Sequence, residues 1–488
     1  MLPDFDALVV RSRTKVTAEL LRSGRRLKVV GRAGIGVDNV DIQAATELGI
    51  LVVNAPTANM ISATEHTFAL LLALARNVAA ANASVKAEQW NRKQFLGTEL
   101  QGKTLGIVGF GRIGQAVAAR ALVFDMQVVA FDPFLDPAVA KRLGVDLMAL
   151  DELLPLADFV TLHTPLTEQT RNLIDREHIA LMKPGARLIN CGRGGVVDEA
   201  ALLEALESGH LAGAALDVFA EEPPADWTLV QHPRVVVTPH IGAQTREAQE
   251  RVATDTVRMV LRALEGSLAV TAVNLPFGAP GQTDVKYLGL AQQLARLASS
   301  LLPGPLVSLQ VDLWGIDPAL HAPVTVAAIK GAFAPALGDA VNFVNAALVA
   351  QGRGVDVVHV AHQRPTGYAH LIGVTVRGES GEVRLEGTLF GEDDPRVVGF
   401  GAYRLEFRPS GRLLVMQNRD VPGVVGRLGT LLGEAGVNIA EIHLAREPGG
   451  DDAVAVLRLD QAPPSAVLDR IRALDEVHDV QLVDLGER

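Results

Sequence analysis

Short apolar runs alternate with amphipathic segments over residues 104–242. Six of the runs, LGIVG, VVAF, FVTLH, RLIN, GAALDV and VVVTPH, are almost continuously apolar. Strands of a parallel sheet that is covered by helices on both faces have this pattern, and the segments between them have the apolar spacing of helices. The pattern predicts an α/β domain with a doubly wound, Rossmann-type sheet.

Shorter strand and helix patterns of the same kind precede this region. Residues 1–58 contain DALVVRS, LKVVGRAG and ILVVN, separated by two helical segments, which predicts a smaller flavodoxin-like α/β lobe. Two long helices rich in Ala and Leu, over about residues 59–88 and 244–266, are expected to join the lobes. Two lobes joined by helices form a cleft that can close.

The pattern changes after residue 274, where the Gly- and Pro-rich stretch FGAPGQT marks a domain boundary. Over residues 284–408, alternating strand patterns (LVSLQVDLWG, VDVVHVAHQ, HLIGVTVRG, EVRLEGTLFG and YRLEFRP) and two helices predict an α+β domain with an antiparallel sheet. From residue 412 onward, the order strand, helix, strand, strand, helix, strand predicts a ferredoxin-like βαββαβ unit.

Composition restricts the kind of protein further. The chain of 488 residues has a formal net charge of −11 and no basic block, which argues against nucleic acid as a main partner. Charged residues break its apolar runs before they reach the ~20 residues that span a bilayer, and its first residues lack the pattern of a signal peptide. We therefore expect a cytoplasmic protein without a membrane segment. The single cysteine, Cys191, excludes an intrachain disulfide and a cysteine-built metal site, and no metal is expected.

A glycine-rich turn provides the first candidate chemistry. Gly109, Gly111 and Gly114 follow an apolar run and open a predicted helix. At this spacing the first glycine permits a tight turn, the second lets the backbone approach a pyrophosphate, and the third lets the helix pack on the strand. Asp132 follows the next apolar run, where its carboxylate can bind the adenosine ribose and repel a 2′-phosphate. The pattern predicts NAD rather than NADP as the cofactor.

Three polar residues follow later strands of the predicted sheet, the edge at which doubly wound sheets bind their ligands. Arg193 lies in NCGRGG, Glu222 in LDVFAEEPP and His240 in TPHIGA. A guanidinium can bind a carboxylate bidentately. An imidazole can accept a hydroxyl proton near neutral pH, and a carboxylate can orient that imidazole. Together the three residues suit hydride transfer from a 2-hydroxy acid.

Each of these residues also fits a role without chemistry. Taken alone, Arg193 is equally compatible with a surface ion pair, Glu222 with a solvated loop charge, and His240 with a hydrogen-bonded strand end. Cys191 lacks the neighbouring base that thiol catalysis requires, so we expect a small residue packed beneath the nicotinamide site rather than a nucleophile. His163 fits either a cofactor contact or a structural residue.

The motifs GFGRIGQ, LHTPL, NCGRGG, ALDVFAEEP and TPHIGA resemble those of the D-2-hydroxyacid dehydrogenases. VRSRTKVTAE, GRAGIGVDNVDIQAA, the stretch FLGTELQGKTLGIVGFGRIG and the two C-terminal domains resemble members that act on a phosphorylated substrate. The likeness covers essentially the whole chain. The resemblance implies NAD-dependent oxidation of 3-phospho-D-glycerate to 3-phosphooxypyruvate, the first step of L-serine synthesis. It gives the catalytic roles to Arg193, Glu222 and His240.

The same resemblance assigns the other site residues. It implies cofactor contacts from Gly109, Gly111, Arg112, Ile113, Gly114, Asp132, His163, Thr164, Pro165, Cys191, Gly192, Arg193, Asp217, His240, Gly242 and Ala243. It implies that the substrate is bound by Arg11, Ser12, Arg32 and Asn59. The arginines of this second group supply the positive pocket that an anionic substrate needs in a chain of negative net charge. Gly192 stands where the family more often has alanine, a change that leaves the backbone donor in place.

The resemblance also assigns the domains. It implies a substrate-binding lobe over residues 1–58 and 250–274, an NAD-binding domain over 59–249, an intervening allosteric substrate-binding domain over 284–408 and an ACT regulatory domain over 412–488. Family members usually begin with one more strand and helix before the stretch matching DALVVRS. We expect a truncated or misassigned start rather than a reduced lobe.

The C-terminal resemblance implies regulation. In the family, the sheets of two ACT domains pair and bind serine at their interface, which implies L-serine as an effector and a homodimer or homotetramer. The residues implied at that site are Asn418, Asp420 and Asn438. The alternative for this domain is a dimerisation module without a ligand.

Other functions compete with this interpretation. A dehydrogenase of glycerate or another short 2-hydroxy acid would use the same chemistry, but it would need fewer cations than Arg11 and Arg32 provide. A dinucleotide-sensing scaffold, resembling the transcriptional corepressors that share this fold, would leave the ACT domain unexplained. An inactive regulatory subunit would agree with the short N-terminal lobe.

Overall fold

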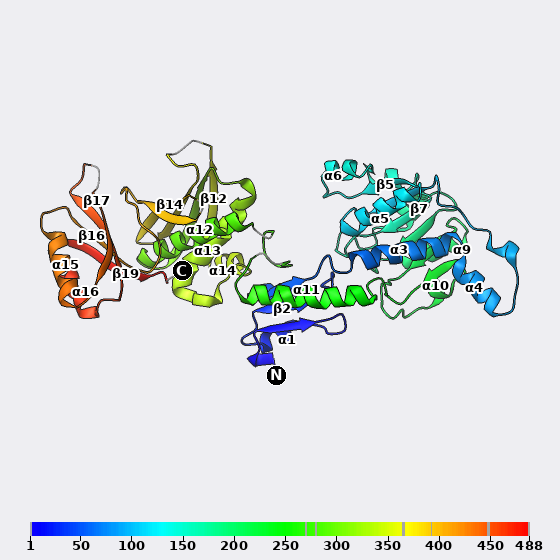
Figure 1. Ribbon diagram of the computed structural model, residues 1–488, viewed down its shortest axis with the longest axis horizontal. Coiled ribbons are helices and arrows are strands. Elements are labelled where there is room, and N and C mark those ends of the chain that lie inside the picture. Colours follow the sequence, from blue (N-terminus) through cyan, green and yellow to red (C-terminus); the bar gives the residue numbers. More distant parts are fainter. Residues whose placement is uncertain are drawn as a thin grey trace.

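The computed structural model describes residues 2–268, 271–278, 281–363, 367–391, 393–446 and 449–486. In this part of the chain, four β-sheets follow one another along an elongated molecule (Figure 1). Figure 1 shows a large lobe at one end, a small lobe around β2, a middle domain and a C-terminal unit at the other end. The long helix α11 (Arg246–Leu264) runs from the large lobe back to the small lobe.

The large lobe is built on a seven-stranded parallel sheet with the order β10-β9-β8-β7-β4-β5-β6. Its strands are Thr104–Val108 (β4), Gln127–Phe131 (β5), Asp146–Leu147 (β6), Phe159–Leu162 (β7), Arg187–Asn190 (β8), Gly213–Leu216 (β9) and Val235–Val237 (β10). Its helices include Arg112–Val123 (α5), Pro137–Arg142 (α6), Leu150–Leu153 (α7), Arg176–Leu181 (α8), Glu199–Glu207 (α9) and Thr228–Gln231 (α10). The predicted Rossmann-type sheet is confirmed, and its strand order reverses between β4 and β7.

Helices cover both faces of this sheet. One hydrophobic cluster joins it to α7, α8 and α9, and another joins it to α5 and to α3 (Met60–Ala75). Strands β7 and β9 are buried along their whole length, as their continuous apolar runs predict. Gly106 in β4 leaves room for a leucine of α7, because a Cβ at Gly106 would lie 2.5 Å from Leu153 Cδ2.

The small lobe has three parallel strands in the order β1-β2-β3. Its elements are the 3-10 turn Leu2–Asp4 (η1), the strands Ala7–Val10 (β1), Val29–Arg32 (β2) and Leu51–Asn54 (β3), and the helices Ala18–Ser23 (α1) and Ile42–Glu47 (α2). Helix α11 packs closely on β2, since a Cβ at Gly31 would lie 2.5 Å from Val260 Cγ2. Helix α11, which follows the large lobe in the sequence, therefore packs against the sheet of the small lobe.

The prediction of one long connecting helix over about residues 59–88 is wrong. The chain forms α3 and a second helix, Val78–Lys86 (α4), which are bent by 65° relative to each other and are followed by the 3-10 turn Arg92–Phe95 (η2). The break falls at Asn77, whose φ of 53° lies in the left-handed region. A residue in that conformation cannot continue a right-handed helix. The second predicted connector is present as α11.

The middle domain has a five-stranded sheet with the order β12-β11-β13-β14-β15. Its strands are Leu306–Trp314 (β11), Asp356–His362 (β12), Leu371–Gly378 (β13), Gly381–Phe390 (β14) and Asp394–Phe400 (β15), and its helices are Gln282–Leu301 (α12), His321–Leu337 (α13) and Ala346–Gly352 (α14), with 3-10 turns Pro318–Leu320 (η3) and Gly338–Ala340 (η4). The sheet is antiparallel except for the parallel pair β11 and β12.

One predicted strand of this domain, YRLEFRP, does not form. Its residues make two isolated bridges to β15, from Tyr403 to Phe400 and from Phe407 to Val397. The tight turn that begins at Gly401, with a φ of 55°, returns the chain at once onto β15, and the pairing does not extend into a continuous ladder.

The segment Pro318–Ala340, which contains α13, is long and apolar enough to cross a bilayer. Most of it is buried inside the middle domain, where Val324, Ala328 and Ile329 join the hydrophobic cluster formed with α12 and β11. Its position is that of a core helix.

The C-terminal unit has the predicted ferredoxin-like order of elements. Its strands are Arg412–Arg419 (β16), Ile439–Arg446 (β17), Asp452–Leu459 (β18) and Val477–Asp484 (β19), and its helices are Val424–Glu434 (α15) and Ser465–Arg472 (α16). Every paired strand in the sheet order β17-β18-β16-β19 is antiparallel to its neighbour. The predicted βαββαβ fold is confirmed.

Substitution of Leu153 tests the packing of α7 on the central sheet. We expect Leu153→Ala to lower the free energy of unfolding of the large lobe by about 2–5 kcal/mol, because it leaves a cavity at a fully buried site. Leu156→Ala is the matched control, since Leu156 is 48% exposed, and it should change that free energy by less than about 0.5 kcal/mol. Urea unfolding followed by circular dichroism compares the variants, and equal losses in both would contradict this packing.

Candidate active site

The three glycines of the turn after β4 meet three different surroundings. Gly109 has a φ of 92°, and a Cβ there would lie 2.8 Å from the carbonyl oxygen of His163. A Cβ at Gly111 would meet no atom within 4 Å, whereas one at Gly114 would lie 2.3 Å from the carbonyl oxygen of Gly109. These surroundings match a tight turn, an open approach to a ligand and close helix packing, in the order that a dinucleotide turn requires.

The surrounding polar groups also fit NAD. Helix α5 begins beside Gly111, whose position supplies no side-chain cap, so N–H groups of the first turn can face a phosphate. The Asp132 carboxylate is fixed at the end of β5 by the backbone N–H groups of Phe110 and Phe134, each at 3.0 Å. Thr164 Oγ1 is buried and has no hydrogen-bond partner among the described residues. A bound ligand could supply that partner.

The predicted cofactor residues gather at the carboxyl ends of neighbouring strands. Arg112 and Ile113 open α5, His163 to Pro165 follow β7, Cys191 to Arg193 follow β8, Asp217 follows β9, and His240, Gly242 and Ala243 follow β10. Because β4, β7, β8, β9 and β10 are parallel and consecutive in the sheet, their ends meet at one edge. The structure thus brings the predicted cofactor set together.

Two residues of this edge are poor candidates for acid–base or nucleophilic chemistry. Burial lowers the pKa of His163 to about 4, and the ring contacts Thr161 Oγ1 at 3.1 Å, so the imidazole is neutral near pH 7. Burial raises the pKa of the Cys191 thiol to about 12. A thiol that holds its proton so firmly is no nucleophile, which favours the small-packing-residue interpretation of Cys191.

His240 and Glu222 form a direct pair. His240 Nδ1 lies 2.7 Å from Glu222 Oε2, and Glu222 Oε1 accepts a hydrogen bond from the backbone N–H of Phe219 at 3.2 Å. The hydrogen bond with Glu222 raises the pKa of His240 above its ordinary value. Burial opposes the ionisation of Glu222, but its hydrogen bonds lower the pKa of this carboxyl overall. The pair is therefore built to stabilise an imidazolium.

Asp217 holds the turn that carries His240. Its carboxylate accepts hydrogen bonds from Thr238 Oγ1 at 2.6 Å and from the N–H groups of Ile241 and Gly242, both at 2.8 Å, and it lies 3.2 Å from His66 Nε2. The side chain is 1% exposed. Sequence reasoning proposed Asp217 as a cofactor contact, which stays a prediction, and it missed this support of the turn.

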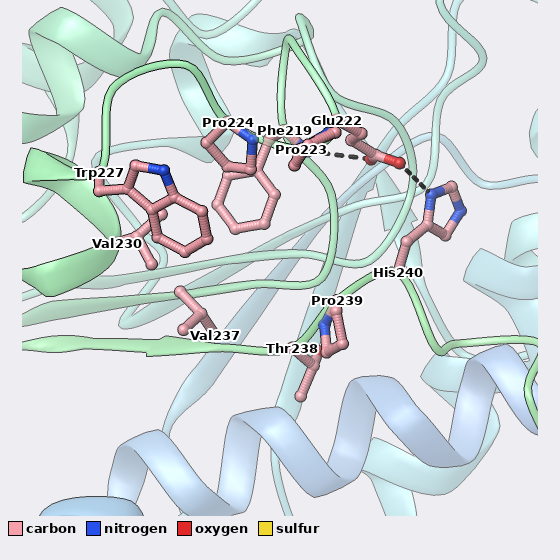
Figure 2. A pocket seen from close by; sticks show the side chains of 10 residues that line it. All are labelled: Phe219, Glu222, Pro223, Pro224, Trp227, Val230, Val237, Thr238, Pro239 and His240. Atoms are coloured by element: carbon pink, nitrogen blue, oxygen red, sulfur yellow. Dashed lines mark hydrogen bonds and ion pairs between the residues drawn. The ribbon is translucent and has the colours of Figure 1, made fainter.

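His240 and Glu222 both line a cavity of about 350 Å³. Figure 2 shows Glu222 between the His240 ring and the apolar side chains of Phe219, Pro224 and Trp227. The cavity wall covers one side of this carboxylate, while the Glu222 side chain as a whole is 37% exposed.

Arg193 reaches from the large lobe to the small lobe. Its Nε lies 3.4 Å from Asp38 Oδ2, and its Nη1 donates to the carbonyl oxygen of Gly192 at 2.8 Å. A Cβ at Gly36 would lie 2.1 Å from Arg193 Nη2, so the absence of a side chain there admits the guanidinium. Asp38 and Gly36 were missed by sequence reasoning, because nothing in their spacing indicates a contact with a residue on another lobe.

Two of the predicted substrate residues lie around one turn of the small lobe, where Asn39 contacts Arg32 Nε at 3.4 Å and the carbonyl oxygen of Arg11 at 3.0 Å. Burial lowers the pKa of Arg32, the nearby charge of Arg193 lowers it further, Asp38 raises it, and Arg11 lowers it. Arg11 also donates to Gln249 of α11. Ser12 lines an open cavity of about 520 Å³.

Asn59 lies at the start of α3, and its Oδ1 is buried without a hydrogen-bond partner in the structure. This orphaned oxygen is consistent with a ligand contact, like the hydroxyl of Thr164.

The predicted serine residues do not meet within one chain. Asn418 and Asp420 lie at the end of β16, where Asp420 pairs with Arg446 at 2.8 Å. Asn438 lies at the other end of α15 and donates to Asp460 at 2.6 Å. Because β16 pairs Arg412 with Leu459 and Asn418 with Ala453, the two groups sit at opposite ends of the sheet. A shared ligand would require a second chain.

Comparisons with known proteins agree along the chain. Residues 68–242 match the family model for the D-isomer specific 2-hydroxyacid dehydrogenase NAD binding domain, residues 285–400 match the D-3-phosphoglycerate dehydrogenase intervening domain, and residues 412–476 match the ACT domain. D-3-phosphoglycerate dehydrogenase of Bacillus subtilis is 43% identical over 99% of this chain and 93% of that protein. That of Mycobacterium tuberculosis (strain H37Rv) is 44% identical over 99% and 92%.

Solved structures resemble about half of the chain. D-lactate dehydrogenase from Aquifex aeolicus, complexed with NAD and lactic acid, is 35% identical with a TM-score of 0.51 over 55% of this chain and 85% of that chain. NAD-dependent formate dehydrogenase from Staphylococcus aureus in complex with NAD is 36% identical with a TM-score of 0.50 over 54% and 81%. The matched NAD-binding model and the fit of the glycine turn both identify NAD as the cofactor.

Two glycine substitutions separate cofactor binding from folding. We expect Gly111→Ala to raise the Kd for NADH about ten-fold, the equivalent of one or two lost hydrogen bonds. The Tm should not change, because the added methyl group enters open space that the ligand would occupy and meets no protein atom. Gly114→Ala should lower the Tm, because its methyl group collides with Gly109. Fluorescence titration with NADH and calorimetry measure the two effects. A loss of Tm in Gly111→Ala with unchanged Kd would contradict this division of roles.

Proposed function

The chain belongs to the family of D-3-phosphoglycerate dehydrogenases, and we propose that it oxidises 3-phospho-D-glycerate to 3-phosphooxypyruvate with NAD, the first step of L-serine biosynthesis. The observation that supports this most strongly is the arrangement at the carboxyl edge of the large sheet. The His240 and Glu222 pair and the glycine turn after β4 lie at that edge, and Arg193 from the same edge contacts Asp38 of the small lobe, which carries Arg11 and Arg32.

His240 acts as the general base. Its Nδ1 faces Glu222 at 2.7 Å, so its Nε2 is the nitrogen left to take the proton of the substrate hydroxyl. As the proton arrives, Glu222 stabilises the imidazolium, which the raised pKa of His240 already reflects. When bound, NAD accepts the hydride from the carbon that carries this hydroxyl.

The arginines bind the two anionic ends of the substrate. Arg193 lies on the His240 side of the cleft, where a planar guanidinium can hold the carboxylate next to the reacting carbon. Arg11 and Arg32 belong to the small lobe and supply the charge for the phosphate. Ser12 and Asn59 add neutral donors and acceptors. These positive charges favour a phosphorylated acid, with its phosphate and carboxylate, over glycerate, which carries a carboxylate alone.

Membership of this family also supports assignments for the domains, the effector and the oligomeric state. We assign substrate binding to residues 1–58 and 250–274, NAD binding to 59–249, the intervening domain to 284–408 and the ACT domain to 412–488. L-serine acts as a feedback effector between the ACT domains of two chains, with Asn418 and Asp420 of one chain facing Asn438 of the other. A cytoplasmic homodimer or homotetramer fits this arrangement.

An assay with purified protein, NAD and 3-phosphoglycerate tests the proposal through the absorbance of NADH. We expect turnover, and we expect His240→Ala to lower kcat about 100-fold or more while the Kd for NADH changes little. His359→Ala, an exposed histidine of the middle domain, is the control and should leave kcat unchanged. Faster turnover of glycerate than of phosphoglycerate would instead favour a dehydrogenase of short 2-hydroxy acids, and no turnover of either would refute the enzymatic assignment.

The pH dependence tests the role of Glu222. A base must be neutral to accept a proton, so kcat/KM should rise with pH through the pKa of His240, which Glu222 holds above its ordinary value. In Glu222→Gln that pKa falls, so the rising limb should move to lower pH while the plateau rate drops. The profile of kcat/KM against pH measures both changes. A limb that stays in place would show that another group controls it.

A further inference from the structure

Asn39 follows β2 and connects the two chain segments that carry the small-lobe arginines. Its Nδ2 donates to the carbonyl oxygen of Arg11 at 3.0 Å and to that of Thr14 at 2.7 Å. Its Oδ1 accepts a hydrogen bond from Arg32 Nε at 3.4 Å. One amide therefore fixes the backbone of the first arginine and the guanidinium plane of the second.

The partners of Arg32 leave part of its guanidinium available. In the described part of the chain, Nε donates to Asn39 and Nη1 donates to the carbonyl oxygen of Ala33 at 3.3 Å. A guanidinium carries five N–H donors in a fixed plane, so holding Nε sets the direction of the remaining ones. Burial and the charge of Arg193 lower the pKa of Arg32, and the charge of Asp38 opposes them, so this half-buried cation is stabilised by Asp38 and by acceptors such as Asn39.

The turn that holds Asn39 also contacts the large lobe through Arg193. The adjacent residue, Asp38, lies 3.4 Å from Arg193 Nε, and both Asp38 and Asn39 line the open cavity that contains Ser12. The turn thus contacts all three arginines. Asn39 touches Arg11 and Arg32 from within the small lobe, while Asp38 touches Arg193 of the large lobe.

We infer that Asn39 is a positioning residue for the anionic substrate, which it aligns by orienting Arg32 and the Arg11 segment toward one phosphate-bearing ligand. This inference rests on the proposed function and names a residue that acts on the same site through its arginines. Asn39 itself takes no part in proton or hydride transfer.

Steady-state kinetics of the full-length enzyme test the inference. We expect Asn39→Ala to raise the KM for 3-phosphoglycerate about ten-fold, since it removes the hydrogen bonds that orient two arginines, while kcat and the KM for NAD change by less than about two-fold. Asn39→Asp keeps an acceptor for Arg32 but turns a carboxylate oxygen toward the carbonyls of Arg11 and Thr14 and adds a negative charge near the anionic substrate, so its KM should rise at least as far as that of Asn39→Ala. Gln43→Ala is the matched control, because Gln43 is an exposed amide of α2 in the same lobe.

A double-mutant cycle separates positioning from general support of the fold. If Asn39 acts through Arg32, Asn39→Ala in the Arg32→Ala background should raise the KM less than it does in the wild type. An unchanged KM in folded Asn39→Ala, or an equal rise of the KM for NAD, would overturn the inference. Full additivity with Arg32→Ala would overturn it as well. If the wild type itself does not oxidise 3-phosphoglycerate, the proposed function fails first, so the two failures are distinguishable.

Discussion

The geometry of the active site depends on one buried carboxylate, that of Asp217. A charge removed from water is tolerated only where hydrogen bonds replace its hydration. Burial alone would raise the pKa of Asp217, but hydrogen bonds from His66, Thr238 and the turn lower it overall. Ile241 and Gly242, the two residues directly after His240, supply two of these bonds, so the charge at Asp217 fixes the turn that carries His240.

This constraint explains how His240 keeps an unfavourable backbone conformation. Its φ of 53° lies in the left-handed region, which residues other than glycine rarely adopt. The turn is held by Asp217 on one side and by the hydrogen bond between the His240 and Thr238 backbones on the other. In this position one ring nitrogen meets Glu222 and the other remains for a ligand. Because His66 belongs to α3, the same carboxylate also joins the turn to the helix that leads from the small lobe into the large one.

Sequence alone predicted the parts of the molecule that depend on local chemistry. Strands buried on both faces must be almost wholly apolar, so the apolar runs predicted β4, β7 and β9. The spacing of the glycines predicted the turn at Gly109. The acid–base capacity of His240 and Glu222 also follows from residue type. Their contact, and the support that Asp217 gives across 24 positions of sequence, depend on tertiary packing that no spacing encodes. The bend at Asn77 was missed because one left-handed residue does not disturb an apolar helical pattern.

The attachment of the C-terminal domains determines which part of the site they can influence. One hydrophobic cluster continues from the middle domain onto a face of the C-terminal sheet, and Arg296 of α12 donates to the carbonyls of Asp484 and Leu485. The middle domain in turn contacts the small lobe, where Asn342 donates to the carbonyl oxygen of Gly49 at 2.7 Å. That lobe carries Arg11 and Arg32. The contacts of the two C-terminal domains therefore lead to the lobe that carries Arg11 and Arg32.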